Sequence, residues 1–247
     1  MLTGLNKLLR YEFKFYFRIM PPFYLALVLA ALAAGFQIRF SPGADSDAAT
    51  WIMVIWICVF TAAAAVNFIL VIQRFRDNLL RDPGYLMLTL PVGPWTLIAS
   101  KAAAALSVSL MSILTGAASL FVLAAASHAV NWNLTMWREV FLNILLREDP
   151  AYIALYAVSM LILIFQQICL IYSVMTASQM LPRFRAIAAF IAYIAAASLV
   201  QQIIPPVLAG AIVDRDMLVW SIVLNFLFAA LFFWLSGFLL KRTLNLE

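Results

Sequence analysis

Six long apolar runs constrain this chain to a fold whose helices cross a lipid bilayer. They cover residues 20–38, 51–72, 95–126, 152–175, 186–204 and 218–240. Hydrophobic residues make up 66% of the sequence and charged residues 11%, whereas soluble domains have about 45–50% and about 25%. Because about 20 apolar residues in a helix cross the hydrocarbon core, we predict an all-α integral membrane protein with six transmembrane helices.

The distribution of basic residues predicts the orientation. Lys and Arg are retained on the cytoplasmic side of a membrane, and acidic residues count for little. With both termini cytoplasmic, the outer segments hold only Arg39, Arg138, Arg147 and Arg215. The inner segments hold Lys7, Arg10, Lys14, Arg18, Arg74, Arg76, Arg81, Lys101, Arg183, Arg185, Lys241 and Arg242. The net charge of +5 is therefore explained by membrane topology, and it predicts no nucleic-acid partner.

Residues 1–19 form a basic segment with helical periodicity. Lys7, Arg10, Lys14 and Arg18 recur at spacings of three and four, and apolar side chains fill another face. This pattern is typical of an amphipathic interfacial helix on the inner leaflet, which would lead into the first span. A cleaved signal peptide is the rival interpretation, because a basic stretch precedes an apolar run. The regular basic spacing favours the amphipathic helix.

Residue types that support catalysis or ion coupling are sparse. No Asp or Glu lies inside the six predicted spans, which argues against a proton-driven carrier. A sodium-coupled or passive six-span carrier or channel stays an alternative, because hydroxyls and backbone carbonyls can bind sodium. His128 is the one histidine, and Cys58 and Cys169 are isolated in different spans. We therefore expect no enzyme active site and no metal or cofactor in this chain.

The chain also lacks a phosphate-binding loop. A Walker loop needs Gly-Lys followed by Ser or Thr, and none of the eight glycines precedes a lysine. Any ATP that drives this protein must bind to another chain.

The loop at 74–94 joins the second and third runs on the basic side. The sequence Asp82-Pro83-Gly84 ends a helical pattern, and an apolar stretch, residues 85–90, follows. Exposed apolar residues in so short a cytosolic segment predict burial against a protein partner. The alternative is that the stretch packs against lipid headgroups or the helix bundle. On the outer side, residues 131–149 have helical spacing and predict an external interfacial helix.

The order of these features resembles the type-2 ATP-binding-cassette (ABC) transporter permeases of bacteria. The shared features are a basic N-terminal amphipathic helix, six spans with both ends inside, and a cytosolic loop with a GYLxxTLPV-like run before a Ser-Lys pair. Here the matching residues are Gly84, Tyr85, Leu86, Thr89, Leu90, Pro91, Val92, Ser100 and Lys101. The topology covers the whole chain, and the motif covers fewer than thirty residues.

The resemblance implies a single transmembrane permease domain over residues 1–247. It would pair with a second permease copy or a related permease and with separate ABC ATPase subunits, which bind the ATP and Mg. The 74–94 loop would be the coupling loop, with the ATPase-partner interface at Asp82, Gly84, Tyr85, Leu86, Thr89 and Pro91. Relatives often place an acid directly before the glycine, where this chain has Pro83 and carries its acid at Asp82.

The resemblance further implies an exporter in the bacterial plasma membrane that works by alternating access. With no buried charge expected, amphipathic or hydrophobic cargo such as a peptide, drug or lipid would suit the path. Amide side chains that would line it are Asn67, Gln166, Gln167, Gln201 and Asn225. Hydrogen bonding between helices is the alternative role for each of them.

Overall fold

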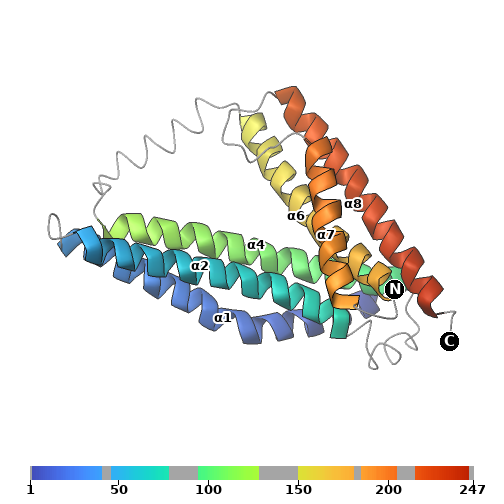
Figure 1. The fold of residues 1–247 in the computed structure, drawn as a ribbon, viewed down its shortest axis with the longest axis horizontal. Helices are drawn as coiled ribbons and strands as arrows, with labels where there is room; N and C mark the ends of the chain where they lie inside the picture. Colours follow the sequence, from blue (N-terminus) through green and yellow to red (C-terminus); the bar gives the residue numbers. More distant parts are fainter. Residues whose placement is uncertain are drawn as a thin grey trace. The chain divides into compact units, whose positions relative to one another are not determined.

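A computed structural model describes residues 2–40, 46–77, 94–127, 150–180, 185–204 and 215–244 (Figure 1). Helices account for nearly all of these residues. Their bounds are Leu2–Phe40 (α1), Ser46–Phe75 (α2), Pro94–Ala126 (α4), Pro150–Ser178 (α6), Arg185–Ile203 (α7) and Arg215–Leu244 (α8). The predicted all-α class is confirmed over this part of the chain. The predicted outer helix at 131–149 lies outside the described residues.

Five of the helices are long and apolar enough to cross a membrane. Their apolar spans are Leu8–Phe40, Met53–Phe75, Trp95–Ala126, Ala151–Ser178 and Arg215–Lys241. The apolar part of α7, Ile187–Ile203, is shorter. At about 1.5 Å per residue it extends about 26 Å, less than a hydrocarbon core of about 30 Å. The sequence predicts six spans, and by length and composition the described helices supply five.

Prolines in this fold occupy positions that helices in a membrane tolerate. Pro94 and Pro150 are the first residues of α4 and α6, where the missing N–H has no helical partner to lose. Pro21 and Pro22 lie inside α1, which continues through both. Each removes one intrahelical hydrogen bond, a loss that neighbouring helices can compensate. The predicted amphipathic segment and first span are thus two parts of one continuous helix.

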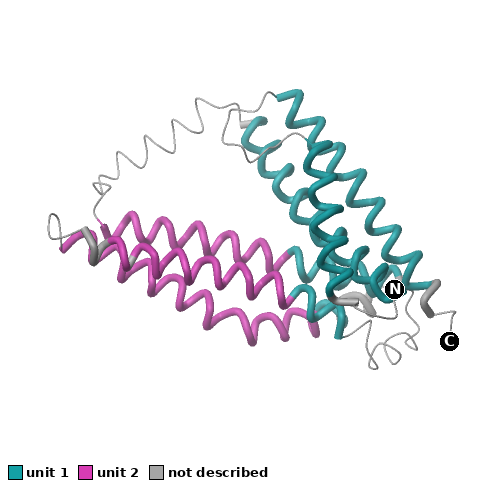
Figure 2. The backbone as a smooth tube through the Cα atoms, viewed as in Figure 1, with its two compact units in different colours: residues 1–9, 71–106, 148–247 teal, residues 10–70, 107–147 magenta. Residues whose placement is uncertain are grey.

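The chain divides into two compact units (Figure 2). Unit 1 comprises Met1–Leu9, Val71–Leu106 and Glu148–Glu247, and unit 2 comprises Arg10–Leu70 and Ser107–Arg147. Unit 1 therefore includes the end of α2, the first part of α4, and α6 to α8. Both helix ends that flank residues 78–93 belong to unit 1.

Unit 2 is packed closely at two glycines of facing helices. A Cβ added at Gly35 of α1 would overlap the Cβ of Ala126 on α4. A Cβ added at Gly116 of α4 would lie 2.9 Å from Cε2 of Phe60 on α2. Small residues allow backbones in a membrane to approach, and packing replaces the hydrophobic drive that water would supply. Glycine at 35 therefore sets the spacing of α1 and α4, and glycine at 116 leaves room for the Phe60 ring.

Two polar pairs also join the helices of unit 2. The hydroxyl oxygens of Tyr24 on α1 and Ser112 on α4 are 2.7 Å apart. Nδ2 of Asn67 on α2 donates to Oγ of Ser109 on α4 at 3.4 Å. Each such bond between membrane helices contributes roughly 0.6–1.7 kcal/mol. Helix α4 is thus bonded to both α1 and α2.

In unit 1, α6 packs against α7 and α8. Leu170 and Val174 of α6 form a buried cluster with Val200 of α7 and with Ile204, which follows α7. Hydroxyl side chains on α6 bond to their own helix; for example, Ser173 donates to the Leu170 carbonyl oxygen at 2.9 Å. Because these hydroxyls are satisfied within α6, they can be buried without a partner on another helix.

Candidate functional site

The six predicted interface residues, Asp82, Gly84, Tyr85, Leu86, Thr89 and Pro91, lie outside the described residues. The structure does describe the two helices from which their loop extends. Helix α2 ends at Phe75, after which Arg76 and Asp77 continue in π-helical geometry, and α4 begins at Pro94. The base of the loop, defined here as the end of α2 and the first three turns of α4, is therefore the candidate site that can be built from contacts.

Tyr172 of α6 links both sides of this base. Its ring stacks on that of Phe75 at the end of α2, with centroids 4.0 Å apart and planes 13° from parallel. Its hydroxyl donates to the backbone carbonyl oxygen of Lys101 on α4 at 3.3 Å. Both aromatic residues are almost fully buried. A single side chain of α6 thus contacts the helix that enters the loop and the helix that leaves it.

Trp95 provides a second link, from the first turn of α4 to α8. Its ring centroid lies 5.7 Å from that of Phe233, and Nζ of Lys241 lies 5.7 Å from the Trp95 ring centroid, within cation–π range. A Cβ added at Gly237 would overlap the Trp95 ring. Glycine at 237 therefore lets the indole lie directly on α8. The sequence pattern gives no signal for this contact.

The Tyr172 link belongs to a buried apolar cluster at the base of the loop, and Phe233, the partner of Trp95, packs against that cluster. It combines Val71 and Phe75 of α2, Leu97, Ile98, Ala102 and Ala105 of α4, Ile168, Ile171 and Tyr172 of α6, and Leu240 of α8. Four helices that are distant in sequence therefore share a core. Displacing either helix end would disturb side chains of α6 and α8.

The Ser-Lys pair of the resemblance is buried. Ser100 is 2% exposed and Lys101 3% exposed, and the Ser100 hydroxyl donates to the Leu97 carbonyl oxygen at 2.8 Å. The length of the third apolar run predicts that its start projects into the cytosol, with Lys101 at the interface. In the structure the Lys101 side chain is enclosed by protein, because α4 enters the shared core within its first two turns. Its position relative to the membrane stays a prediction.

The five predicted path amides fall into different environments. Gln167 accepts a hydrogen bond from the Tyr193 hydroxyl at 3.3 Å, across α6 and α7, and Asn67 bonds to α4. Asn225 donates to a backbone oxygen of its own helix, that of Ser221, at 2.8 Å. Gln201 is exposed. The contacts of Asn67 and Gln167 therefore support a role in hydrogen bonding between helices.

Gln166 differs from the other amides. Its side chain is 1% exposed, and neither Nε2 nor Oε1 has a hydrogen-bond partner. A buried amide without partners costs free energy, about 1–3 kcal/mol in mutational data. Among the five amides, Gln166 is therefore the one whose burial is not explained by a hydrogen bond.

Within the described residues no group of three or more His, Cys, Asp or Glu could hold a metal ion. Cys58 is an exposed free thiol on α2, and Cys169 a buried one on α6. His128 lies outside the described residues.

Comparison with protein-family models, curated proteins and solved structures finds no match for this chain. The multiple apolar helices indicate a membrane protein of several spans.

Proposed function

We propose that this chain is the transmembrane subunit of an ATP-driven ABC transporter. It is an exporter of amphipathic or hydrophobic cargo, a peptide, drug or lipid, and it works by alternating access in the bacterial plasma membrane with both termini cytoplasmic. The chain hydrolyses no nucleotide itself. ATP and Mg bind the ABC ATPase subunits, and a second permease copy or a related permease completes the pathway.

The observation that carries this proposal is the shared core at the base of the loop. Phe75 and Trp95 lie at the two ends of residues 78–93, and both contact helices distant in sequence. Protein interiors are close-packed and transmit strain. A load applied to the loop by a soluble partner would therefore reach α6 through Tyr172 and α8 through Phe233.

The composition of the loop fits a protein partner. Its apolar stretch at residues 85–90 follows a turn at Asp82-Pro83-Gly84, and apolar side chains on a cytosolic surface are characteristic of docking sites. Leu86 and Tyr85 would enter a cleft of the ATPase, with Thr89 and Pro91 at its border. ATP-driven closure of the paired ATPases would then move the loop, α2 and α4 together.

The test is affinity purification of the chain in mild detergent, with identification of co-purifying chains and an ATPase assay of the complex. We expect a stoichiometric subunit with a Walker loop, and we expect Leu86→Asp to abolish substrate-stimulated hydrolysis. Gly84→Pro should do the same, because proline cannot adopt many conformations open to glycine. Leu134→Asp, on the predicted outer loop, is the matched control and should leave hydrolysis unchanged.

One observation favours a second candidate, a sodium-coupled or passive carrier or channel. The buried, unpaired amide of Gln166 is the kind of polar group that lines a solute path inside a membrane. In that case the purified chain would be an oligomer free of ATPase. Reconstituted vesicles would then show solute flux without ATP, and Gln166→Leu would reduce that flux.

A further inference from the structure

An apolar groove lies between α1 and α4 within unit 2. Helix α1 lines it with Phe13, Phe17, Pro21 and Tyr24, and α4 lines it with Ser107 and Met111. The buried side chains of Tyr16, Met20 and Val108 complete the lining. The groove is open on one side, where Phe17 is 59% exposed.

The size of the groove limits what can occupy it. Its volume is about 90 Å³, smaller than the roughly 150 Å³ cavity that holds a benzene molecule in an engineered protein. It therefore accommodates a few methylene groups of a hydrocarbon chain but not an aromatic ring. A continuous chain whose remainder lies along the protein surface fits these dimensions.

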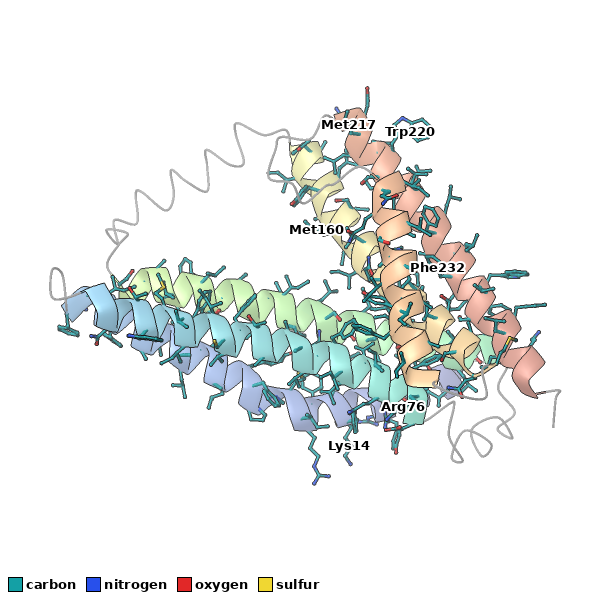
Figure 3. All side chains as sticks on the ribbon, in the orientation of Figure 1. Lys14, Arg76, Met160, Met217, Trp220 and Phe232 are labelled. Atoms are coloured by element: carbon teal, nitrogen blue, oxygen red, sulfur yellow. The ribbon has the colours of Figure 1, made fainter. Side chains whose placement is uncertain are left out.

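A row of cations borders the groove. Arg10, Lys14 and Arg18 are exposed and are spaced four residues apart on α1, so they share one face of the helix. Lys14 lies on the outer side of α1 (Figure 3). The one acidic residue of α1, Glu12, is buried. The row therefore presents three exposed cations, while the acid of α1 is buried.

The cationic row and the groove are adjacent by helix geometry. Each basic residue precedes a groove residue by three positions: Arg10 precedes Phe13, Lys14 precedes Phe17 and Arg18 precedes Pro21. Residues three apart are neighbours on a helix surface. A ligand with a hydrocarbon chain in the groove would thus place a negatively charged head beside Lys14 and Arg18.

We propose that this groove binds one anionic phospholipid of the inner leaflet, with part of an acyl chain in the groove and the phosphate at Lys14 and Arg18. Basic residues concentrate on the cytoplasmic side of membrane proteins, where they attract anionic lipid. A second copy of the chain is a poorer occupant, because a two-fold contact through this groove would bring two cationic rows together. The site does not depend on the transport function.

The first experiment measures lipid retention by the full-length chain. The chain is reconstituted in nanodiscs of equal phosphatidylglycerol and phosphatidylcholine, extracted in mild detergent, and weighed by native mass spectrometry. We expect phosphatidylglycerol to remain bound in preference. Each of Lys14→Gln and Arg18→Gln should reduce that preference about fivefold. One basic residue near an anionic lipid contributes about 1 kcal/mol, which corresponds to that change in affinity. Arg39→Gln, an exposed cation at the other end of α1, is the control and should change nothing.

The second experiment fills the groove without changing charge. Met111→Trp adds volume at the α4 wall and should abolish retention of phosphatidylglycerol, whereas Met111→Leu, of similar volume, should retain it. Ile113→Trp, an exposed position on α4 outside the groove, controls for adding an indole at the lipid surface. Far-ultraviolet circular dichroism confirms that each variant keeps its helices.

Three results would overturn the proposal. The first is equal retention of phosphatidylglycerol and phosphatidylcholine by the unaltered chain. The second is an equal effect of Arg39→Gln and Arg18→Gln, which would mean attraction by surface charge in general. The third is displacement of the lipid by excess glycerol 3-phosphate, which would identify a site for soluble phosphate compounds. Loss of ATPase co-purification would leave these expectations unchanged, so failure of the two proposals can be distinguished.

Discussion

Units 1 and 2 are made of equally apolar helices, yet different contacts hold them together. Unit 1 has a large buried core in which aromatic rings stack, with Tyr172 and Trp95 linking helices distant in sequence. Unit 2 relies on close approach at Gly35 and on hydrogen bonds such as that between Tyr24 and Ser112. The aromatic core of unit 1 lies at the base of residues 78–93, where the proposed coupling would apply its load.

The largest expected effect is at the centre of unit 1. Tyr172→Ala should lower the free energy of unfolding by about 3–5 kcal/mol, as expected for removing a buried aromatic side chain. Tyr172→Phe keeps the stack on Phe75 and loses only the hydrogen bond to Lys101, so it should cost about 0.5–1.5 kcal/mol. Unfolding by dodecyl sulfate in bicelles, followed by circular dichroism, measures both. Equal losses would show that stacking contributes little and would remove the contrast between the units.

Close packing in unit 2 predicts the next effect. Gly35→Ala should lower the free energy of unfolding by about 1–3 kcal/mol, because its Cβ meets Ala126, which has no room to yield. Gly116→Ala is the matched control. There the added Cβ meets the ring edge of Phe60, a half-exposed side chain that can rotate away. The same titration compares them, and a larger loss for Gly116→Ala would contradict glycine-mediated spacing of α1 and α4.

The polar pairs of unit 2 should have a smaller effect. Tyr24→Phe removes the bond to Ser112 and should lower the free energy of unfolding by roughly 0.6–1.7 kcal/mol. A double-mutant cycle with Ser112→Ala isolates the bond itself. If the two single losses add without any interaction energy, the 2.7 Å contact does not stabilise the unit.

The smallest effects are expected at two adjacent amides of unit 1, and one of them has the opposite sign. Gln166→Leu should leave the free energy of unfolding unchanged or raise it by roughly 1 kcal/mol, since it removes two unpaired buried polar atoms. Gln167→Leu should lower it by roughly 0.6 kcal/mol through loss of the bond from Tyr193. A destabilised Gln166→Leu protein would mean that the amide has a stabilising partner in the membrane.

Much of the fold follows from the sequence, because apolar runs of sufficient length in a membrane must be helical. The all-α class and the positions of the long helices could be predicted in this way. Two features could not be decided from the sequence. The apolar part of α7 is too short for an unambiguous span, and α1 continues through Pro21 and Pro22. Length and proline content do not determine how neighbouring helices compensate for such features.

The contacts of the candidate site were harder to predict from the sequence. Helices that are apolar on every side carry no pattern that tells which face meets protein, so the contacts of Tyr172 and Gly237 have no sequence signal. Burial of Lys101 is likewise a property of the assembled core. The motif at Gly84 to Pro91 was found by resemblance, and its role as a partner interface stays a prediction, because these residues lie outside the described part of the structure.

Photo-crosslinking in cells tests the proposed coupling role of residues 78–93 most directly. A photoreactive phenylalanine analogue replaces Leu86, and in a parallel strain it replaces Leu134 of the predicted outer loop. Crosslinked chains are then identified by mass spectrometry. We predict that Leu86, and not Leu134, crosslinks to a subunit with a Walker loop. Absence of such a subunit at Leu86, or its equal capture at both positions, would contradict the permease assignment.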